Sequence, residues 1–228
     1  MIYAISDLHL DHTKEKDMKI FGDGWQDYEE KIFKFWDIVD QDDLVLIAGD
    51  ISWAMKIEDA KIDLDRIDSL KGKKIILKGN HDYWWTSLNK IRALGFESIE
   101  FLQNDALVFN NTRICGTRGW ISRDDKDFTD HDEKVFKREL MRLELSLKYK
   151  LDQQYDQTIV MMHYPPFDRE LKANEFEELF KKYGVDKVVY GHIHGKFANF
   201  MPEGLINGIE YYCTSADKLG FKPILIRK

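Results

Sequence analysis

The sequence predicts an α/β protein built around a parallel sheet, and three observations support this class. In the first hundred residues, short apolar runs alternate with segments of helical periodicity, which is the pattern of successive βαβ units. Polar and metal-binding side chains follow several of these runs directly, as expected where ligand loops leave the carboxyl ends of parallel strands. The last thirty residues resemble strands separated by Pro and Gly turns, which suits a second sheet.

The first half of the chain gives the clearest elements. Its short apolar runs predict buried strands at Ile2–Ile5, Leu44–Ala48 and Ile75–Leu77. Between them, two segments place apolar residues at helical spacing, one from Tyr28 to Val39 and one from Ile57 to Ile67. Gly72 then provides a helix stop. The order is βαβαβ, so we expect a parallel sheet flanked by helices.

The second half is less regular but continues the same alternation. Residues 98–117 predict short strands, and residues 122–133 predict an acidic loop. Helices are expected at Phe136–Leu151 and Phe176–Tyr183. Strands are expected at Thr158–Met162 and Lys187–Tyr190, and several more from Phe197 to Ile226. No repeat or linker interrupts the pattern, so residues 1–228 are predicted to form a single domain.

Composition limits the classes of function. No apolar run approaches the roughly 20 residues of a bilayer-spanning helix, and the first ten residues lack the basic start of a signal peptide. We therefore expect no membrane partner. Cys115 and Cys213 form no CxxC pair, so we expect two buried thiols in a reducing cytoplasm. The net charge of −7 disfavours nucleic acid as a partner. It does not exclude an anionic substrate, because bound cations reverse a local potential.

Five short motifs carry the metal-binding side chains, and each stands at the end of a predicted strand. In extended chain, residues two apart face the same side, so the pairs Asp7/His9 and His192/His194 can each reach one ion. Together the motifs supply seven N and O ligands without a thiolate: Asp7, His9, Asp50, Asn80, His163, His192 and His194. This set suits two ions of Mn²⁺, Fe or Zn²⁺ better than Mg²⁺.

Read in order, the motifs DxH, GD, GNHD, H and GHxH resemble those of the calcineurin-like metallophosphoesterase superfamily, from Asp7 to His194. The resemblance implies a four-layer α-β-β-α sandwich of two mixed sheets with flanking helices. It also implies two divalent metal ions and hydrolysis of a small phosphorylated substrate, a phosphate monoester or diester, by metal-activated hydroxide. In the implied arrangement Asp50 bridges the ions; Asp7, His9 and His194 complete one site, and Asn80, His163 and His192 the other.

The resemblance also implies catalytic roles for His81 and Asp82. His81 would contact the phosphoryl group or protonate the leaving oxygen, and Asp82 would orient and charge-stabilise its imidazole. Arg118 is a candidate for binding a substrate phosphate, although an ion pair with the acidic loop is an equal alternative. Four aromatic residues either line the pocket or pack the core, and packing is favoured for most of them: Trp53, Tyr83, Trp84 and Trp85.

Several positions differ from the motifs of particular subclasses of the superfamily, and these differences disfavour the activities of those subclasses. Trp53 stands where purple acid phosphatases carry a tyrosine ligand, and the arginine of the Ser/Thr protein phosphatase motif GDxVDRG is absent. His81 stands where lipid-precursor pyrophosphohydrolases usually carry arginine. Small phosphodiesters and phosphomonoesters both remain open as substrates. The alternatives are a non-catalytic scaffold, which the complete ligand set disfavours, and a nuclease, which the negative charge disfavours.

Overall fold

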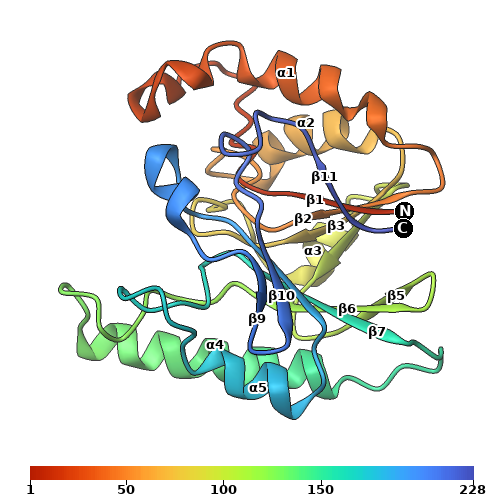
Figure 1. The fold of residues 1–228 in the computed structure, drawn as a ribbon. Coiled ribbons are helices and arrows are strands. Elements are labelled where there is room, and N and C mark those ends of the chain that lie inside the picture. Colours follow the sequence, from red (N-terminus) through yellow and green to blue (C-terminus); the bar gives the residue numbers. More distant parts are fainter.

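The computed structural model describes residues 1–228 as two stacked sheets with helices on both outer faces (Figure 1). The first sheet has the strand order β11-β1-β2-β3-β4. Its strands are β1 (Ile2–Ile5), β2 (Leu44–Ile47), β3 (Lys73–Leu77), β4 (Ile99–Leu102) and β11 (Ile224–Arg227). In this sheet β1 to β4 run parallel, and β11 lies antiparallel beside β1.

The second sheet has the order β5-β6-β7-β8-β10-β9. Its strands are β5 (Leu107–Phe109), β6 (Thr112–Thr117), β7 (Gln157–Met162), β8 (Lys187–Tyr190), β9 (Gly204–Ile206) and β10 (Ile209–Cys213). The four inner strands run parallel, and the edge strands β5 and β9 are antiparallel to their neighbours. Both sheets are therefore mixed.

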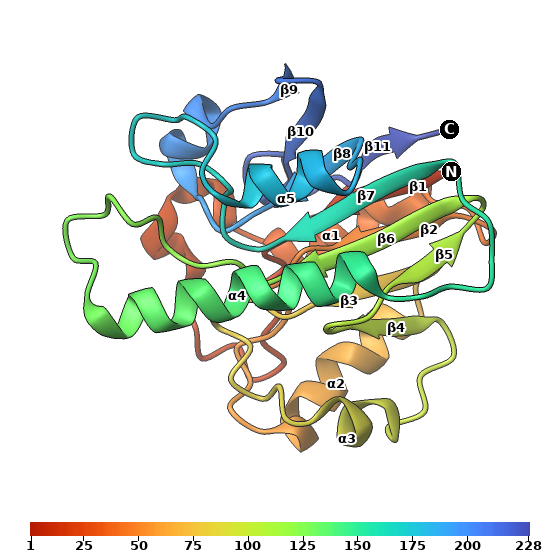
Figure 2. The same ribbon diagram turned by 90° about the horizontal axis from the view of Figure 1, so that it is seen from below.

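Five α-helices complete the outer layers: α1 (Tyr28–Phe35), α2 (Ile57–Asp68), α3 (Leu88–Arg92), α4 (Asp130–Lys148) and α5 (Phe176–Lys182). The first three cover the first sheet, and α4 and α5 cover the second (Figures 1 and 2). The predicted four-layer α-β-β-α sandwich is thus confirmed. None of these helices combines the length and apolarity that crossing a membrane requires.

Side-chain alternation along the strands explains why the sheets stack. Successive residues of a strand point to opposite faces, and in β1 both faces are apolar. Ile2 and Ala4 pack between the sheets, whereas Tyr3 and Ile5 pack under the helices of the first sheet. Strands that are buried on both faces read as continuous apolar runs, which is why the sequence marks them so clearly.

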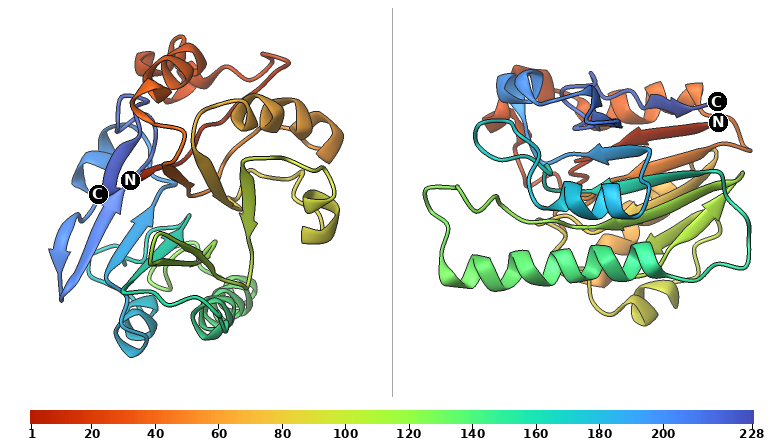
Figure 3. Two further views of the ribbon diagram at one scale, coloured as in Figure 1. Left: turned by 90° about the vertical axis from the view of Figure 1, so that its right-hand side faces the viewer. Right: turned by 60° about the horizontal axis from the view of Figure 1, so that its bottom comes forward.

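Several predictions about elements were wrong. The strands expected from Phe197 onward begin only at β9, because residues 195–200 form a 3-10 helix. The last strand, β11, was expected in a second sheet but joins the first, where Leu225 pairs with Tyr3 and the two termini lie side by side (Figure 3). Residues 130–133 were expected to belong to an acidic loop but form the first turn of α4. There Thr129 and Asp132 form a reciprocal capping box, and acidic residues are favourable at a helix N-terminus.

Candidate metal centre

The structure brings the five motifs together where strands of both sheets end. Each motif directly follows a strand: Asp7 and His9 follow β1, Asp50 follows β2, Asn80 follows β3, His163 follows β7, and His192 and His194 follow β8. Because the strands of each sheet run parallel, their carboxyl ends share one edge. The seven predicted ligands therefore meet although they span most of the chain.

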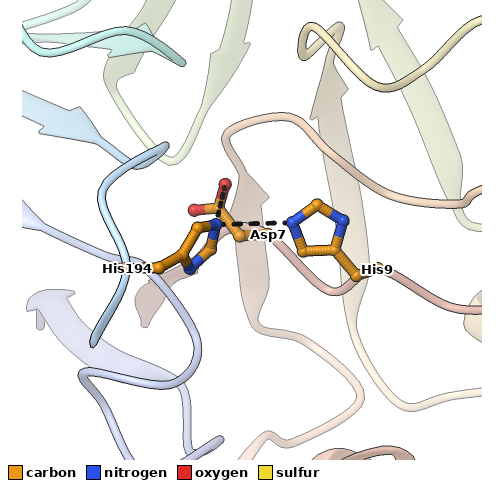
Figure 4. Close-up of side chains that lie close together, drawn as sticks. All are labelled: Asp7, His9 and His194. Atoms are coloured by element: carbon orange, nitrogen blue, oxygen red, sulfur yellow. Dashed lines mark hydrogen bonds and ion pairs between the residues drawn. The ribbon is translucent and has the colours of Figure 1, made fainter. Parts of the chain in front are cut away.

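The first group consists of Asp7, His9 and His194, and one ligand atom from each lies within 4.8 Å of the others (Figure 4). The Nε2 atoms of His9 and His194 are 3.4 Å apart. Asp7 Oδ1 lies 3.8 Å from His194 Nε2. Asp7 and His9 are buried, so their polar atoms face this cluster and not solvent.

The second group consists of Asp50, His163 and His192, within the same 4.8 Å limit. His163 Nε2 lies 3.4 Å from Asp50 Oδ2 and 3.3 Å from His192 Nδ1. Asn80 Oδ1 lies 2.6 Å from the same nitrogen of His163. Asp50 Oδ2 is also 3.7 Å from His9 Nε2, so this carboxylate lies between the two groups.

The hydrogen-bond chemistry of the cluster fits metal ions. His163 Nδ1 lies 3.0 Å from the carbonyl oxygen of Ala48 and donates its proton to it, which leaves a lone pair on Nε2. Burial lowers the pKa of His163 to about 3, so the ring is neutral. Its Nε2 lone pair then faces two further acceptors, the side-chain oxygens of Asn80 and Asp50. A bound cation would accept electron density from all three of these atoms and so remove the repulsion between their lone pairs.

Buried negative charge supports the same reading. Burial, and then the charges of Asp82 and Asp7, raises the pKa of Asp50 well above its usual range. A bound cation offsets this accumulation of carboxylates. Two such ions fit the donor set, with Asp7, His9 and His194 on one and Asn80, His163 and His192 on the other. The N and O ligands without sulfur suit Mn²⁺, Fe or Zn²⁺.

Backbone conformation marks the same residues. Asp7, His9, Asp50 and His192 have φ angles of 58°, 47°, 53° and 75°, in the left-handed region. This conformation costs about 1–2 kcal/mol for an ordinary L-residue, and such strain concentrates at functional sites. It turns each strand end sharply, so that the side chain points into the cluster.

Close backbone approach explains two of the motif glycines. A Cβ atom on Gly79 would lie 2.1 Å from Asp50 Oδ1, and one on Gly191 would lie 2.4 Å from Asp7 Oδ2. Both contacts are far below what real Cβ atoms tolerate. Glycine is required at these positions because the carboxylates of Asp50 and Asp7 lie against the backbone.

One residue of the centre was not found from the sequence. Asp217, which follows β10, accepts a hydrogen bond from His194 Nδ1 at 3.1 Å and one from the backbone N–H of Gly195 at 2.7 Å. A carboxylate behind a ligating histidine fixes its tautomer and raises its basicity. No motif or periodicity distinguishes Asp217 from other acidic residues, so only the fold reveals it.

Asp82 was expected to orient the ring of His81, and the structure shows other hydrogen-bond partners for it. Asp82 is fully buried, but it forms no hydrogen bond with His81, whose Nδ1 has no partner. Instead its carboxylate accepts hydrogen bonds from the indole N–H of Trp84 and from four backbone N–H groups, those of Gly79, Asp50, Ile51 and Ser52. Asp82 therefore ties the loop after β2 to the loop after β3.

His81 lies at the rim of the cluster. Its backbone N–H donates to Asp50 Oδ1 at 2.8 Å, and its ring is half-buried against Trp53, with centroids 4.5 Å apart. Trp53 also stacks on His9 at 4.9 Å. Trp84 and Trp85 are buried in the first core, as expected for packing residues.

Arg118 and the neighbouring Arg123 have different partners. Arg118 does not contact the acidic loop; its guanidinium lies 3.6 Å from Glu139 of α4 and over the ring of Trp120. Arg123 pairs with Glu133 and Glu175, as a surface ion pair. Arg118 lies beside the metal centre, because its carbonyl oxygen accepts a hydrogen bond from the backbone N–H of His163.

The fold and the site define a class: α/β sandwiches that present two groups of metal-binding side chains at the carboxyl ends of their strands. The chain belongs to the calcineurin-like phosphoesterase family, whose model matches residues 1–196. Membership of this family implies hydrolase activity. The resemblance noted from the five motifs is confirmed.

Solved structures show the same fold at low sequence identity. The protein AQ665 of Aquifex aeolicus, described as of unknown function, aligns over 98% of this chain and 94% of its own, with 18% identity and a TM-score of 0.50. The protein TT1561 of Thermus thermophilus aligns over 93% and 87%, with 14% identity and a TM-score of 0.54. No curated protein matches the chain.

Asp217 gives a first testable prediction. Asp217→Asn weakens the acceptor behind His194 and should lower the affinity for Mn²⁺ or Zn²⁺ by about 10-fold or more, measured by competition with a chromophoric chelator. Asp156→Asn is the matched control, because Asp156 is an exposed carboxylate that pairs with Arg227. Equal metal affinities in the two variants would contradict the role given to Asp217.

Asp82 gives a second. Asp82→Asn replaces one acceptor oxygen by an N–H₂ group that faces backbone donors, and charge-assisted hydrogen bonds contribute about 1.5–3 kcal/mol each. We expect the free energy of unfolding to fall by about 3 kcal/mol, measured by denaturant titration in EDTA, with Asp156→Asn again as control. Wild-type stability combined with slower turnover would instead indicate that Asp82 acts on His81.

Proposed function

We propose that the protein is a binuclear metal-dependent phosphoesterase that hydrolyses phosphate monoesters or diesters of small molecules. The observation that carries the proposal is the geometry of the cluster. Two groups of buried N and O ligands share Asp50 between them, and a histidine that is not needed as a ligand stands at their rim. This arrangement suits a phosphoryl group held in front of His81.

The chain's own side chains divide the work. Asp7, His9 and His194 would hold one ion, and Asn80, His163 and His192 the other, with Asp50 shared; Mn, Fe and Zn all suit this donor set. When bound, such a pair supplies positive charge for the phosphoryl oxygens and makes water more acidic. Asp217 and the Ala48 carbonyl hold the imidazoles of His194 and His163 in the ligating tautomer.

His81 would deliver a proton to the leaving oxygen. Its backbone is fixed by Asp50, and its ring is held by Trp53 on one side. Its Nδ1 has no partner in the protein, so neither a carboxylate nor a carbonyl competes for the ring. A ring that is fixed in place but free of partners can serve as general acid.

We further propose that residues 1–228 act as one domain on a small phosphorylated substrate in the cytoplasm. Ligands from both sheets contribute to one site, which supports a single domain. The two buried free thiols suit a reducing compartment. The net charge of −7 speaks against nucleic acid as substrate.

The proposal is tested by hydrolysis of p-nitrophenyl phosphate and bis-p-nitrophenyl phosphate after metal removal and refilling with Mn²⁺. We expect turnover of at least one ester, and the preferred ester distinguishes a monoesterase from a diesterase. Asp50→Asn should abolish paired metal binding and activity together, because Asp50 lies between both groups. Bound metals without hydrolysis of these or other phosphate esters would favour the non-catalytic scaffold.

His81 can be tested separately. His81→Ala should retain both metals but lower kcat by about 10²–10⁴-fold, with the larger loss for alkyl esters, whose leaving oxygens need the proton most. His131→Ala is the control, because His131 is exposed and lies outside the motifs. Metal content is measured beside the rate; loss of metal from His81→Ala would make His81 a ligand.

A further inference from the structure

A polar cavity lies beside the metal centre. It is lined by residues at β3 and β4 of the first sheet, at β6 of the second sheet, and on the covering helix α4. Its volume is about 280 Å³, and its walls include Lys78, Thr117, Arg118, Arg138, Glu139 and Arg142. We call it the basic pocket. None of these six residues belongs to the ligand set.

The walls of the basic pocket share backbone with the metal centre. Lys78 stands two residues before Asn80, a reach of at most about 7 Å along extended chain. The carbonyl oxygen of Arg118 accepts hydrogen bonds from the N–H groups of His163 and Tyr164, at 3.1 and 2.9 Å. The loop after β3 therefore supplies Asn80 to the metal centre and Lys78 to the pocket, and the loop of Arg118 is hydrogen-bonded to the loop of His163.

The pocket contains more positive charge than its single carboxylate can offset. Glu139 is buried and lies 2.7 Å from Arg142, 3.6 Å from Arg118 and 3.8 Å from Arg138, so three guanidinium groups share it. Lys78 is half-buried and has no ion-pair partner. Four cations and one anion give a local charge of +3, in a chain whose net charge is −7.

Part of this hydrogen-bonding capacity is unused. The buried Nε of Arg118 has no hydrogen-bond partner. Its guanidinium lies over Trp120, 4.5 Å from the ring centroid, a cation–π contact that holds the donors in place. Glu139 already accepts from the Thr117 hydroxyl as well as from Arg142. An incoming anion with several acceptor oxygens would give the unpaired, half-buried Lys78 a counter-charge.

A chain of aromatic contacts connects the two sites. The centroid of the Tyr164 ring lies 4.1 Å from that of the His192 ring and 5.3 Å from that of the Trp120 ring. The guanidinium of Arg118 in turn lies over the Trp120 ring. Because Lys78 also stands only two residues before Asn80, a small ligand with two anionic groups can place one at the metal centre and the other among the cations.

We infer that the basic pocket binds a second, non-scissile phosphate group of the substrate, and that the substrates are small molecules with two phosphate groups. Arginine forks match phosphate oxygens in geometry and charge, and the cavity has room for one such group. The inference rests on the proposed function for its metal-centre half, whereas the affinity of the pocket for phosphate does not require bound metal.

The binding half is tested with inorganic phosphate on the full chain in EDTA, by calorimetry. We expect one saturable site with a Kd on the order of 1 mM, weakened about tenfold by Lys78→Met and by Arg142→Gln. Arg123→Gln is the control, because Arg123 is an arginine of the same half of the molecule that is already paired with two carboxylates. Absent binding, or equal loss in all three variants, overturns the inference.

The substrate half is tested on the Mn²⁺-loaded chain with matched esters, adenosine 3′,5′-bisphosphate against adenosine 5′-monophosphate, and fructose 1,6-bisphosphate against fructose 6-phosphate. We expect a higher kcat/KM for the bisphosphate of at least one pair, and a fall of that preference by about tenfold in Arg142→Gln, mainly through KM. No preference in either pair overturns the substrate role. Phosphate binding without hydrolysis of any ester overturns the proposed function instead.

Discussion

The metal-binding cluster depends on one buried carboxylate, that of Asp82. Placing a charged group where no water reaches it is costly unless hydrogen bonds replace its hydration. Here five N–H groups do so, four of them from the backbone of the loops after β2 and β3. Because both loops bind the same carboxylate, Asp50 and Asn80 keep a fixed separation. The left-handed conformation of Asp50 is held in the same way.

The second sheet is joined to the first at the same place. His163 follows a strand of the second sheet, yet its Nδ1 donates to the carbonyl of Ala48, at the end of β2. A Cβ on Gly49 would lie 2.6 Å from that nitrogen, so the first sheet leaves a space that the imidazole fills. The inter-sheet core, with Ala48 and Met161 among its members, brings the sheets close enough for this contact.

Local patterns made much of this predictable. Strands that are buried on both faces appear as apolar runs, and side chains two apart appear as DxH and GHxH, so β1, β8 and all seven members of the cluster were found from the sequence. Non-local partners leave no such pattern. Asp82 was expected to serve its sequence neighbour His81, but its hydrogen bonds go mainly to residues about thirty positions away. The position of β11 likewise depends on pairing with β1, more than two hundred residues earlier.

Charge distinguishes the metal centre from the basic pocket, although the loop after β3 contributes to both. The metal centre gathers the buried carboxyl groups of Asp7, Asp50 and Asp82, which disfavour a phosphate until divalent cations are bound. The basic pocket is positive from its own side chains. Attraction of an anion to the metal centre is therefore conditional on metal, whereas attraction to the pocket is permanent. A negatively charged protein can thus hold an anionic substrate by one end before the reacting end is bound.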